Sequence, residues 1–224
     1  MTLDKTPETI QTMFNMIADK YDFVNNAMSF GTQNFVKKQS IKLLEIPPHA
    51  KVLDLCCGTG DLSKIVKKQS PSALVTGIDF SKRMISIAKK NVDGVEFLQG
   101  DVTNLPYPDD FFDFVIMGFG LRNILNAEKA IEEVFRVLKP SGTFLHLDFG
   151  QKNLASKIYD IMTPILIRLF TENRGAYAYL IRSKQEFPTP DDLIKDFESK
   201  GLKFVCRKDF LFGVISAQVL CKSI

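Results

Sequence analysis

Three predicted strands each lead into residues that could bind a nucleoside. Gly58 and Gly60 follow the first apolar run, and a Gly-x-Gly turn lets the backbone approach a ligand without side-chain obstruction. Asp79 ends the next apolar run, and Asp101 follows the third. A carboxylate beside such a turn can accept hydrogen bonds from ribose hydroxyls. The spacing therefore predicts a nucleoside-type cofactor, although Gly-x-Gly turns also serve simple packing between a strand and a helix.

The residues after the turn distinguish two cofactor classes. A dinucleotide brings a pyrophosphate, which favours a helix N-terminus without acids and a third small residue for close helix packing. Here Asp61 follows the turn directly, and Ser63 stands in place of the third glycine. S-adenosylmethionine carries a sulfonium and no phosphate, so a carboxylate near the turn is electrostatically acceptable. The sequence favours S-adenosylmethionine over a nicotinamide dinucleotide.

The composition fits one ordinary globular unit. The chain has 224 residues, 45% of them hydrophobic and 25% charged, and it has no apolar run of about 18 residues that would span a bilayer. The first residues lack the features of a secretory signal, which predicts a cytoplasmic protein. A net charge of +3 is too small to predict a nucleic acid partner. The four cysteines match neither a disulfide framework nor a zinc site, and no metal is expected.

The elements that must position these residues alternate along the middle of the chain. Apolar runs alternate with helical stretches from Lys51 to Gly150, the pattern of a parallel sheet covered on both faces. A turn signal at 139–142 separates the last of these helices from the fifth strand. The expected strands are 51–55, 74–79, 94–98, 112–117 and 143–149, and the helices between them include 61–69, 82–91 and 127–138.

Two β-rich runs near the C-terminus complete the predicted sheet. They extend over 203–210 and 214–221 and are expected to form a hairpin around Phe212 and Gly213. The fold class is therefore α/β, with a doubly wound, mostly parallel sheet of seven strands.

Helical segments flank this core on both sides. Residues 1–46 are expected to form an N-terminal helical lid or flank, and 47–224 a single globular domain. Within that domain, 154–199 is an inserted helical segment on the substrate side, before the last two strands. The stretch 154–170 is apolar on nearly every side, which fits either a core helix or a surface that faces a lipid-like substrate or a membrane. In the second interpretation, Lys157 and Arg168 would extend toward headgroups.

Several motifs closely resemble those of the ubiquinone/menaquinone-biosynthesis C-methyltransferases, the UbiE/MenG family of class I S-adenosylmethionine-dependent enzymes with a Rossmann-like fold. The resemblance covers roughly 13–194, and its most specific part is the Phe-Gly-Leu-Arg-Asn run. The sequence departs from the family pattern at Gln33, Val36, Arg182 and Gln218. The matching segments are 21–25 with Ser29 and Gly31, 105–109, 119–123, 136–142, and Tyr179-Leu180 with Ser183 and Phe187-Pro188.

The resemblance implies roles for the residues of the cofactor half. It implies that Thr59 and Asp79 contact the cofactor, and that Asp101 with Val102 meets the adenine. The chemistry of Asp101 and Val102 is consistent with this role, because a carboxylate can accept from the adenine amino group while a backbone N–H donates to a ring nitrogen. Asp101 could also act only as a turn residue that caps nearby backbone groups. Asp54 fits hydrogen bonding within the turn at least as well as ligand contact.

The implied reaction is C-methylation of a reduced prenylated quinone precursor, most simply demethylmenaquinol in menaquinone biosynthesis. A quinol whose hydroxyl loses its proton is nucleophilic at the adjacent ring carbon, and the quinone is not. Arg122, just beyond the fourth predicted strand, is the main candidate to stabilise the phenolate or to hold a water that accepts the proton. Asn123 could orient ring oxygens, and Tyr21 belongs to a segment that could close over the cofactor. His146 is expected to be a core residue, and Asp148, nearer the end of the strand, is expected to face the cleft.

The sequence leaves several partners and functions open. The acceptor could be a ubiquinol precursor, or another small molecule methylated on oxygen or nitrogen. The chain could also be a scaffold subunit of a quinone-biosynthesis complex, or a nucleotide-binding oxidoreductase. The expected partner is a lipophilic quinol. Peripheral contact with the inner face of a membrane and assembly into a homodimer remain open.

Overall fold

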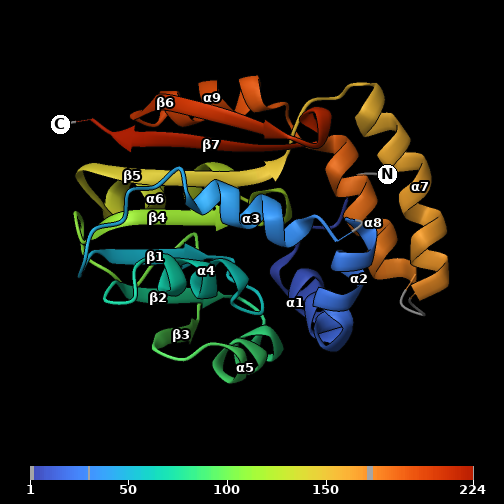
Figure 1. Ribbon diagram of the computed structural model, residues 1–224, viewed down its shortest axis with the longest axis horizontal. Coiled ribbons are helices and arrows are strands. Elements are labelled where there is room, and N and C mark those ends of the chain that lie inside the picture. The colour runs from blue at the N-terminus through green and yellow to red at the C-terminus, as the bar shows by residue number, and fades with distance from the viewer. Residues whose placement is uncertain (1–2, 30, 171–173, 224) are drawn as a thin grey trace.

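A mixed sheet runs through the molecule in the strand order β3-β2-β1-β4-β5-β7-β6 (Figure 1). The computed structural model describes residues 3–29, 31–170 and 174–223, and within them seven strands form this one sheet. Neighbouring strands from β3 to β5 are parallel, whereas β7 pairs antiparallel with both β5 and β6. The strands are β1 (Lys51–Leu55), β2 (Leu74–Asp79), β3 (Val95–Gln99), β4 (Phe112–Gly118), β5 (Leu138–Phe149), β6 (Leu202–Phe210) and β7 (Ile215–Lys222).

Helices cover both faces of the sheet, and apolar side chains fill the two layers between. One layer joins the strands to α3 and α4, and the other joins them to α6 and α9. Figure 1 shows α3 and α4 in front of the sheet and α6 behind it. The helical elements are α1 (Pro7–Ile17), η1 (Ala18–Lys20), α2 (Tyr21–Met28), α3 (Gln33–Ile41), α4 (Asp61–Gln69), α5 (Lys82–Asn91), η2 (Leu121–Asn123), α6 (Ala127–Val137), α7 (Leu154–Phe170), α8 (Arg174–Glu186), α9 (Pro190–Ser199) and η3 (Leu211–Gly213).

The predicted α/β fold with a doubly wound, mostly parallel sheet is confirmed. Helices α4 and α5 begin and end where the sequence predicted, and Ser81 caps α5 by accepting from the backbone N–H of Met84 at 3.1 Å. One boundary is wrong, because β5 begins at Leu138 and not after the turn signal. The residues from Lys139 to Gly142 instead form an irregularity inside the strand, where its register with β4 shifts and Ser141 takes a left-handed conformation.

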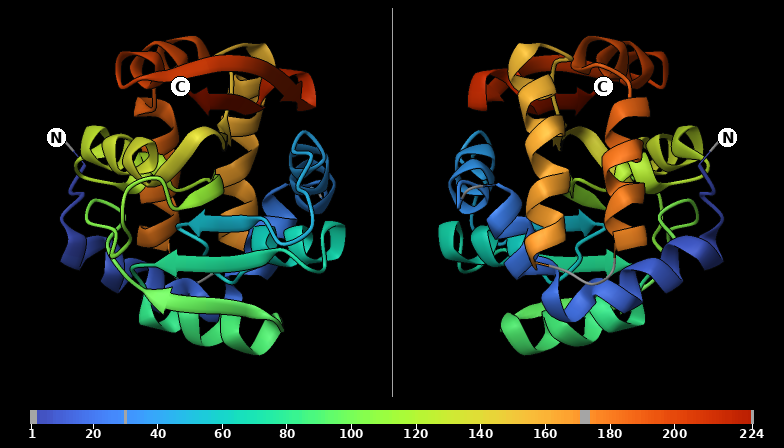
Figure 2. Two further views of the ribbon diagram at one scale, coloured as in Figure 1. Left: turned by 90° about the vertical axis from the view of Figure 1, so that its left-hand side faces the viewer. Right: turned by 90° about the vertical axis from the view of Figure 1, so that its right-hand side faces the viewer.

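Four helices form a cap over the carboxyl ends of the parallel strands. Helices α1, α2, α7 and α8 pack on one another through a shared cluster that includes Ile17, Val24, Ile167 and Tyr177. Figure 2 (right) looks onto this cap, with α7 and α8 upright and α1 crossing beneath them. Helix α3 is not part of the cap, because its apolar side packs on the sheet. The N-terminal segment therefore divides between the cap and the face of the sheet.

Helix α7 is not the core helix that one interpretation of its sequence predicted. Leu154, Ile158 and Ile161 are 73%, 50% and 69% exposed, whereas Thr163 and Ile167 are buried. The helix is therefore buried on one side and apolar on the other. Lys157 is exposed, and the side chain of Arg168 lies outside the described residues.

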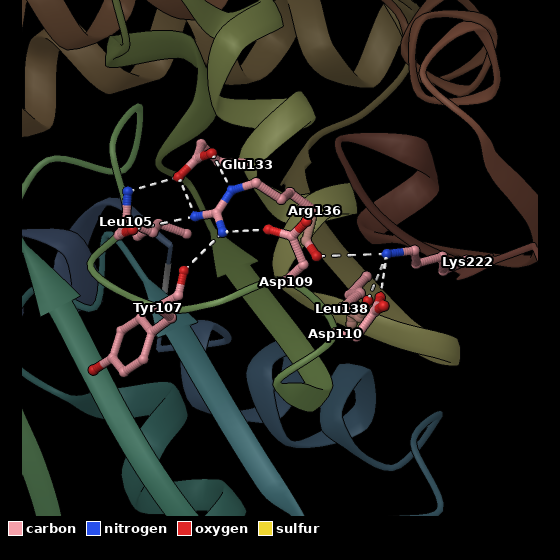
Figure 3. Close-up of polar contacts among 8 residues, drawn as sticks. All are labelled: Leu105, Tyr107, Asp109, Asp110, Glu133, Arg136, Leu138 and Lys222. Atoms are coloured by element: carbon pink, nitrogen blue, oxygen red, sulfur yellow. Dashed lines mark hydrogen bonds and ion pairs between the residues drawn. The ribbon is translucent and has the colours of Figure 1, made fainter.

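A network around Arg136 holds the long connection between β3 and β4. Its guanidinium donates to the backbone carbonyls of Leu105 and Tyr107, and to the carboxylates of Asp109 and Glu133 (Figure 3). The second oxygen of Glu133 also accepts from the Leu105 backbone N–H at 2.7 Å. Two of the motifs that carried the family resemblance thus bind each other. Their role is structural, since they fix the segment that follows Asp101.

Candidate active site

Two cavities meet where the order of the parallel strands changes direction. The chain moves from β1 to β2 on one side and from β4 to β5 on the other, and ligands of doubly wound sheets bind at such a point. The β2 cavity extends toward Asp79, and the α7 cavity extends toward Tyr159. Their shared wall consists of Tyr21, Cys56, Gly58, Gly118 and Phe119. A ligand in one cavity therefore lies next to a ligand in the other.

The β2 cavity brings together the residues predicted to bind the cofactor. Gly58, Asp79, Asp101 and Val102 all line it. The Asp79 carboxylate accepts from the backbone N–H groups of Gly58 at 2.9 Å and Ser81 at 2.8 Å. Burial raises the pKa of Asp79, and these backbone donors act against that rise. The carboxylate that faces the cavity is thus held in place by the turn it adjoins.

Asp101 is both a turn residue and part of the cavity wall. One of its oxygens, Oδ1, accepts from the backbone N–H and the hydroxyl of Thr103, each at 2.8 Å. Asp101 is exposed, while the neighbouring Val102 is buried. The two interpretations that the sequence left open for Asp101 are therefore compatible.

The two glycines of the turn serve different purposes. Gly58 has a φ of +56°, and a Cβ built on it would meet no atom within 4 Å, so its bare backbone faces the open cavity. Gly60 has a φ of +88°, and a Cβ there would lie 2.9 Å from the Phe97 ring and 3.0 Å from Val92. Gly60 lies outside both cavity linings and is required for packing. Gly58 is the position that leaves space for a ligand.

Thr59 and Asp61 connect the turn to the N-terminal helices. The Thr59 hydroxyl donates to Asp22 of α2 at 2.7 Å, and Asp61 accepts from Lys37 of α3 at 2.8 Å. Both residues line the α7 cavity and not the β2 cavity. Burial raises the pKa of Asp22. The structure thus places these two predicted cofactor residues where Thr59 holds the cap, through α2, and Asp61 holds α3 against the turn.

Helix α1 closes the β2 cavity through contacts that sequence reasoning missed. Gln11 donates to the carbonyl of Phe80 at 2.9 Å, and Asn15 accepts from the Ser81 hydroxyl at 2.6 Å. Asp19, in the next turn, pairs with Arg83 at 2.8 Å. Gln11, Asn15 and Asp19 are spaced by four residues, so they share one side of a helix. This polar stripe is the signal that could have revealed the contact.

The shared wall contains two non-glycine residues in the left-handed conformation. Cys56, after β1, has a φ of +55°, and Phe119, after β4, has a φ of +58°. Such a conformation costs on the order of 1–3 kcal/mol per residue and occurs mainly at functional sites. β1 and β4 are neighbours in the sheet, so both strained residues stand at the junction of the cavities. Burial raises the pKa of the Cys56 thiol well above its usual range, so it stays protonated.

Arg122 lies in the wall of the α7 cavity and is only 5% exposed. Its Nη1 donates to Asp148 Oδ1 and to the Phe119 carbonyl, each at 2.8 Å. The guanidinium carbon lies 5.0 Å from the centre of the Phe149 ring. Arg122 Nε is buried and makes no hydrogen bond within the described residues. Arg122 is therefore a fixed cation in the cavity wall, with one buried donor that has no partner among the described residues.

Asn123 and Tyr21 occupy different positions around Arg122. Asn123 lines the β2 cavity, and its Oδ1 is buried and without a hydrogen bond among the described residues. Tyr21 stands in the wall shared by both cavities. Burial raises the pKa of Tyr21 despite the opposing charge of Arg122, so the phenol remains protonated and can donate.

Lys184 is a buried cation of the α7 cavity in addition to Arg122 and Lys37, and the sequence did not single it out. It forms an ion pair with Asp160, and its ammonium donates to the Ser156 hydroxyl at 2.9 Å. Its Nζ lies 5.3 Å from the centre of the Phe149 ring, which also contacts Arg122. Burial lowers the pKa of Lys184, and Asp160 opposes the change. A lysine in a polar helix carries no sequence signal for this placement.

Two further residues, Asp54 and His146, lie as the sequence predicted, and a third, Asp148, does not. Asp54 accepts from the backbone N–H of Ser63 at 3.0 Å and from its hydroxyl at 2.6 Å, as predicted for hydrogen bonding within the turn. Burial raises the pKa of Asp54 to about 7. His146 is a buried core residue whose ring contacts Gln218 at 3.1 Å. Asp148 does not face the cleft, because it is fully buried and acts through Arg122.

No helix in the described part of the chain is long and apolar enough to cross a bilayer. Among the same residues, no group of three or more His, Cys, Asp or Glu is placed to hold a metal ion.

Solved structures with this fold include several methyltransferases. A possible histamine N-methyltransferase from Thermotoga maritima matches with a TM-score of 0.70 at 18% identity, covering 96% of this chain and 100% of that one. An S-adenosylmethionine-dependent methyltransferase from Methanococcus maripaludis matches with a TM-score of 0.66 at 20% identity, covering 94% of both. These similarities show the class I methyltransferase fold.

Sequence relatives carry a more specific name. The demethylmenaquinone methyltransferases of Bacillus cereus (strain ATCC 10987 / NRS 248) and Bacillus cytotoxicus are 34% and 32% identical to this chain, each over 92% of both sequences. The model of the ubiE/COQ5 methyltransferase family matches residues 2–222. This chain therefore belongs to the ubiE/COQ5 methyltransferase family and is an S-adenosylmethionine-dependent methyltransferase.

Proposed function

We propose that this enzyme methylates a ring carbon of a reduced, prenylated quinone precursor and that demethylmenaquinol is its acceptor. The curated relatives named above support this substrate class. The observation that carries the proposal is the shared wall of the two cavities, because Arg122 lines the cavity next to the one that would hold the cofactor. The α7 cavity would then hold the acceptor ring.

The β2 cavity fits S-adenosylmethionine by the chemistry of its donors and acceptors. Asp79 would accept from the ribose hydroxyls, and Asp101 with Val102 would meet the adenine. Gly58 leaves open space where the backbone can approach the ligand. When bound, S-adenosylmethionine supplies an electrophilic methyl group on a sulfonium.

Arg122 would stabilise the anion that makes the acceptor nucleophilic. Ring-carbon methylation needs an electron-rich carbon, and a quinol provides one when a hydroxyl loses its proton. An arginine is permanently protonated, so Arg122 would stabilise the phenolate oxygen or hold a water that takes the proton. Asp148 fixes the guanidinium, which would keep its charge at the wall of the α7 cavity.

Tyr21 and Asn123 would orient the two reactants. Tyr21 could donate to either ligand, because it stands in the shared wall and stays protonated. Asn123 lines the β2 cavity, which supports a contact near the cofactor. Part of the wall of the α7 cavity suits an aromatic, lipophilic ring, because its lining includes Met28, Val36, Leu62, Phe149, Leu180, Ile181 and Ile215.

The proposal is tested by identifying the methylated product. Purified enzyme is incubated with labelled S-adenosylmethionine and, in separate reactions, reduced demethylmenaquinone, its benzoquinol counterpart and histamine. We expect label in the naphthoquinol, with a mass gain of one methyl group on a ring carbon. Label only in the benzoquinol would assign a ubiquinol precursor, and label only in histamine would refute quinol methylation. Unchanged cellular quinone content with Arg122→Ala would instead favour a scaffold.

A further inference from the structure

The outer side of α7 presents an apolar surface. Among the described side chains of α7, the exposed ones are apolar apart from Lys157, and none of them is acidic. Helices that face water normally carry polar residues there, and contiguous exposed apolar patches mark interaction sites. These exposed apolar residues are Leu154, Ile158, Ile161, Met162 and Pro164.

Phe212 extends this surface beyond the start of the helix. Its side chain is 92% exposed, and its backbone is left-handed with a φ of +56°. The Asn153 side-chain amide donates to the Phe212 carbonyl at 2.8 Å, which fixes η3 against the first turn of α7. A strained turn thus holds an aromatic ring in solvent. We call Leu154, Ile158, Ile161, Met162 and Phe212 the α7 patch.

The inner side of the same helix lines the α7 cavity. Tyr159, Asp160 and Thr163 contribute to the wall that also contains Arg122. A molecule on the α7 patch is therefore separated from this cavity by one helix, about 10 Å across. A groove lined by Lys152, Ser156 and Lys157 lies beside the helix start, and it shares Phe149, Asp160 and Lys184 with the α7 cavity. The groove therefore lies between the border of the patch and the α7 cavity, with which it shares a wall.

Two lysines flank the start of the α7 patch. Lys152 and Lys157 are exposed, and the acidic residue of α7, Asp160, is half-buried and paired with Lys184. Apolar side chains flanked by lysines match the interface of a bilayer with anionic headgroups. A second copy of the same surface would bring identical positive charges, which disfavours self-association.

We infer that the α7 patch docks on an anionic phospholipid bilayer. The apolar side chains enter the boundary between headgroups and acyl chains, and Lys152 and Lys157 contact the phosphates. A further consequence rests on the proposed function: a prenylated quinol reaches the α7 cavity along the groove while its tail stays in lipid. The docking itself does not depend on the identity of the acceptor.

Flotation of the full chain with vesicles tests the docking. The probes are vesicles of phosphatidylcholine with and without phosphatidylglycerol, and the variant is Ile158→Glu/Ile161→Glu. The matched control is Leu74→Glu, because Leu74 is 57% exposed at the start of β2. It lies at the amino ends of the parallel strands, whereas the cap covers their carboxyl ends. We expect the wild type and L74E to float with anionic vesicles, and the double variant to bind at least about tenfold more weakly.

Lys152→Glu/Lys157→Glu should also lower binding to the anionic vesicles. Equal flotation of wild type and I158E/I161E would overturn the inference, as would failure of the wild type to bind. Light scattering adds an independent outcome: a wild-type dimer that I158E/I161E converts to a monomer would assign the patch to a second copy.

Kinetics separate this inference from the proposed function. I158E/I161E should keep the kcat/KM of a tail-less, water-soluble quinol and lose at least about tenfold with a long-tailed quinol in vesicles. Vesicle binding by an enzyme that methylates no quinol would refute the proposed function and leave the docking intact. Equal losses for both acceptors would overturn the link between docking and substrate access.

Discussion

Arg122 and Asn123 are consecutive, yet their side chains line different cavities. Arg122 lies in the α7 cavity with Phe149, and Asn123 lies in the β2 cavity with Asp79. The short helix η2 begins after the left-handed Phe119, whose carbonyl accepts from both side chains at 2.8 and 3.3 Å. One strained turn thus fixes a cation in the wall of the α7 cavity and an amide in the wall of the β2 cavity.

Removing the Arg122 charge should damage chemistry more than cofactor binding. Arg122→Met should lower kcat by about 10²–10³, the loss found when one stabiliser of a developing oxyanion is removed. The dissociation constant for S-adenosylmethionine, measured by calorimetry, should change by less than about threefold, because Arg122 lies outside the β2 cavity.

Two companion variants control this experiment. R122M/D148N removes the buried carboxylate that R122M would leave unpaired, so a stability loss can be separated from the kinetic loss. Arg207→Met removes a surface arginine that also pairs with an aspartate, and it should keep full activity. A kcat of R122M/D148N close to that of the wild type would contradict the role of Arg122.

The two glycines of the turn should respond differently to alanine. Gly58→Ala fills open cavity space, so it should fold with a modest loss of stability and weaken cofactor binding by at least about tenfold. Gly60→Ala forces a methyl group against Phe97 and Val92, so it should lower the melting temperature strongly. Thermal unfolding with and without the cofactor distinguishes the cases. The account of Gly58 fails if G58A binds S-adenosylmethionine as tightly as the wild type.

Asp54 should make stability fall as pH rises. Its pKa in the folded protein is raised from 3.8 to about 7, mainly by burial, so the folded state holds a proton that the unfolded chain releases. The free energy of unfolding should therefore decrease from about pH 4 to about pH 7, by up to roughly 4 kcal/mol for this residue. Asp54→Asn retains an acceptor for Ser63 and removes the titration. Urea unfolding across this range should show a flatter profile for D54N, and identical profiles would refute the assignment.

Breaking the Arg136 network should loosen the segment behind Asp101. Arg136→Met leaves Glu133 and the carbonyls of Leu105 and Tyr107 without their shared donor, which should cost about 1–3 kcal/mol of unfolding free energy. If Asp101 and Val102 meet the adenine as proposed, the KM for S-adenosylmethionine should rise while kcat changes little, because this segment follows them in the wall of the β2 cavity. A normal KM in a destabilised R136M would show that the network serves folding alone.

The sheet could be predicted from sequence because its signals are local. Alternating apolar runs and the turn after β1 identify the strands, and Ser81 marks the start of α5. The gathering of Gly58, Asp79 and Asp101 at one edge follows from parallel strands ending together. The irregularity inside β5 was missed, because a turn signal such as Pro140-Ser141 does not reveal whether pairing resumes in the same strand.

The helices of the cap could be predicted, but their contacts could not, because these join segments that are distant in the sequence. Nothing near Lys184 in the sequence indicates that Asp160 and Phe149 will surround it. The sequence predicts that Thr59 contacts a ligand. Its hydrogen bond to Asp22 forms because α2 lies over the turn, which the sequence does not indicate. The exposed side of α7 was ambiguous for the same reason, since apolar periodicity does not say which side has a neighbour.

The redox state of the acceptor provides the most direct test of the central claim. Under anaerobic conditions, the transfer of labelled methyl from S-adenosylmethionine is measured for the same naphthoquinone in its reduced and oxidised forms, with wild type and R122M/D148N. We predict transfer to the quinol alone, and a rate at least about 100-fold lower in the variant. Equal transfer to the quinone, or no transfer to either form by an enzyme that binds S-adenosylmethionine, would contradict the account.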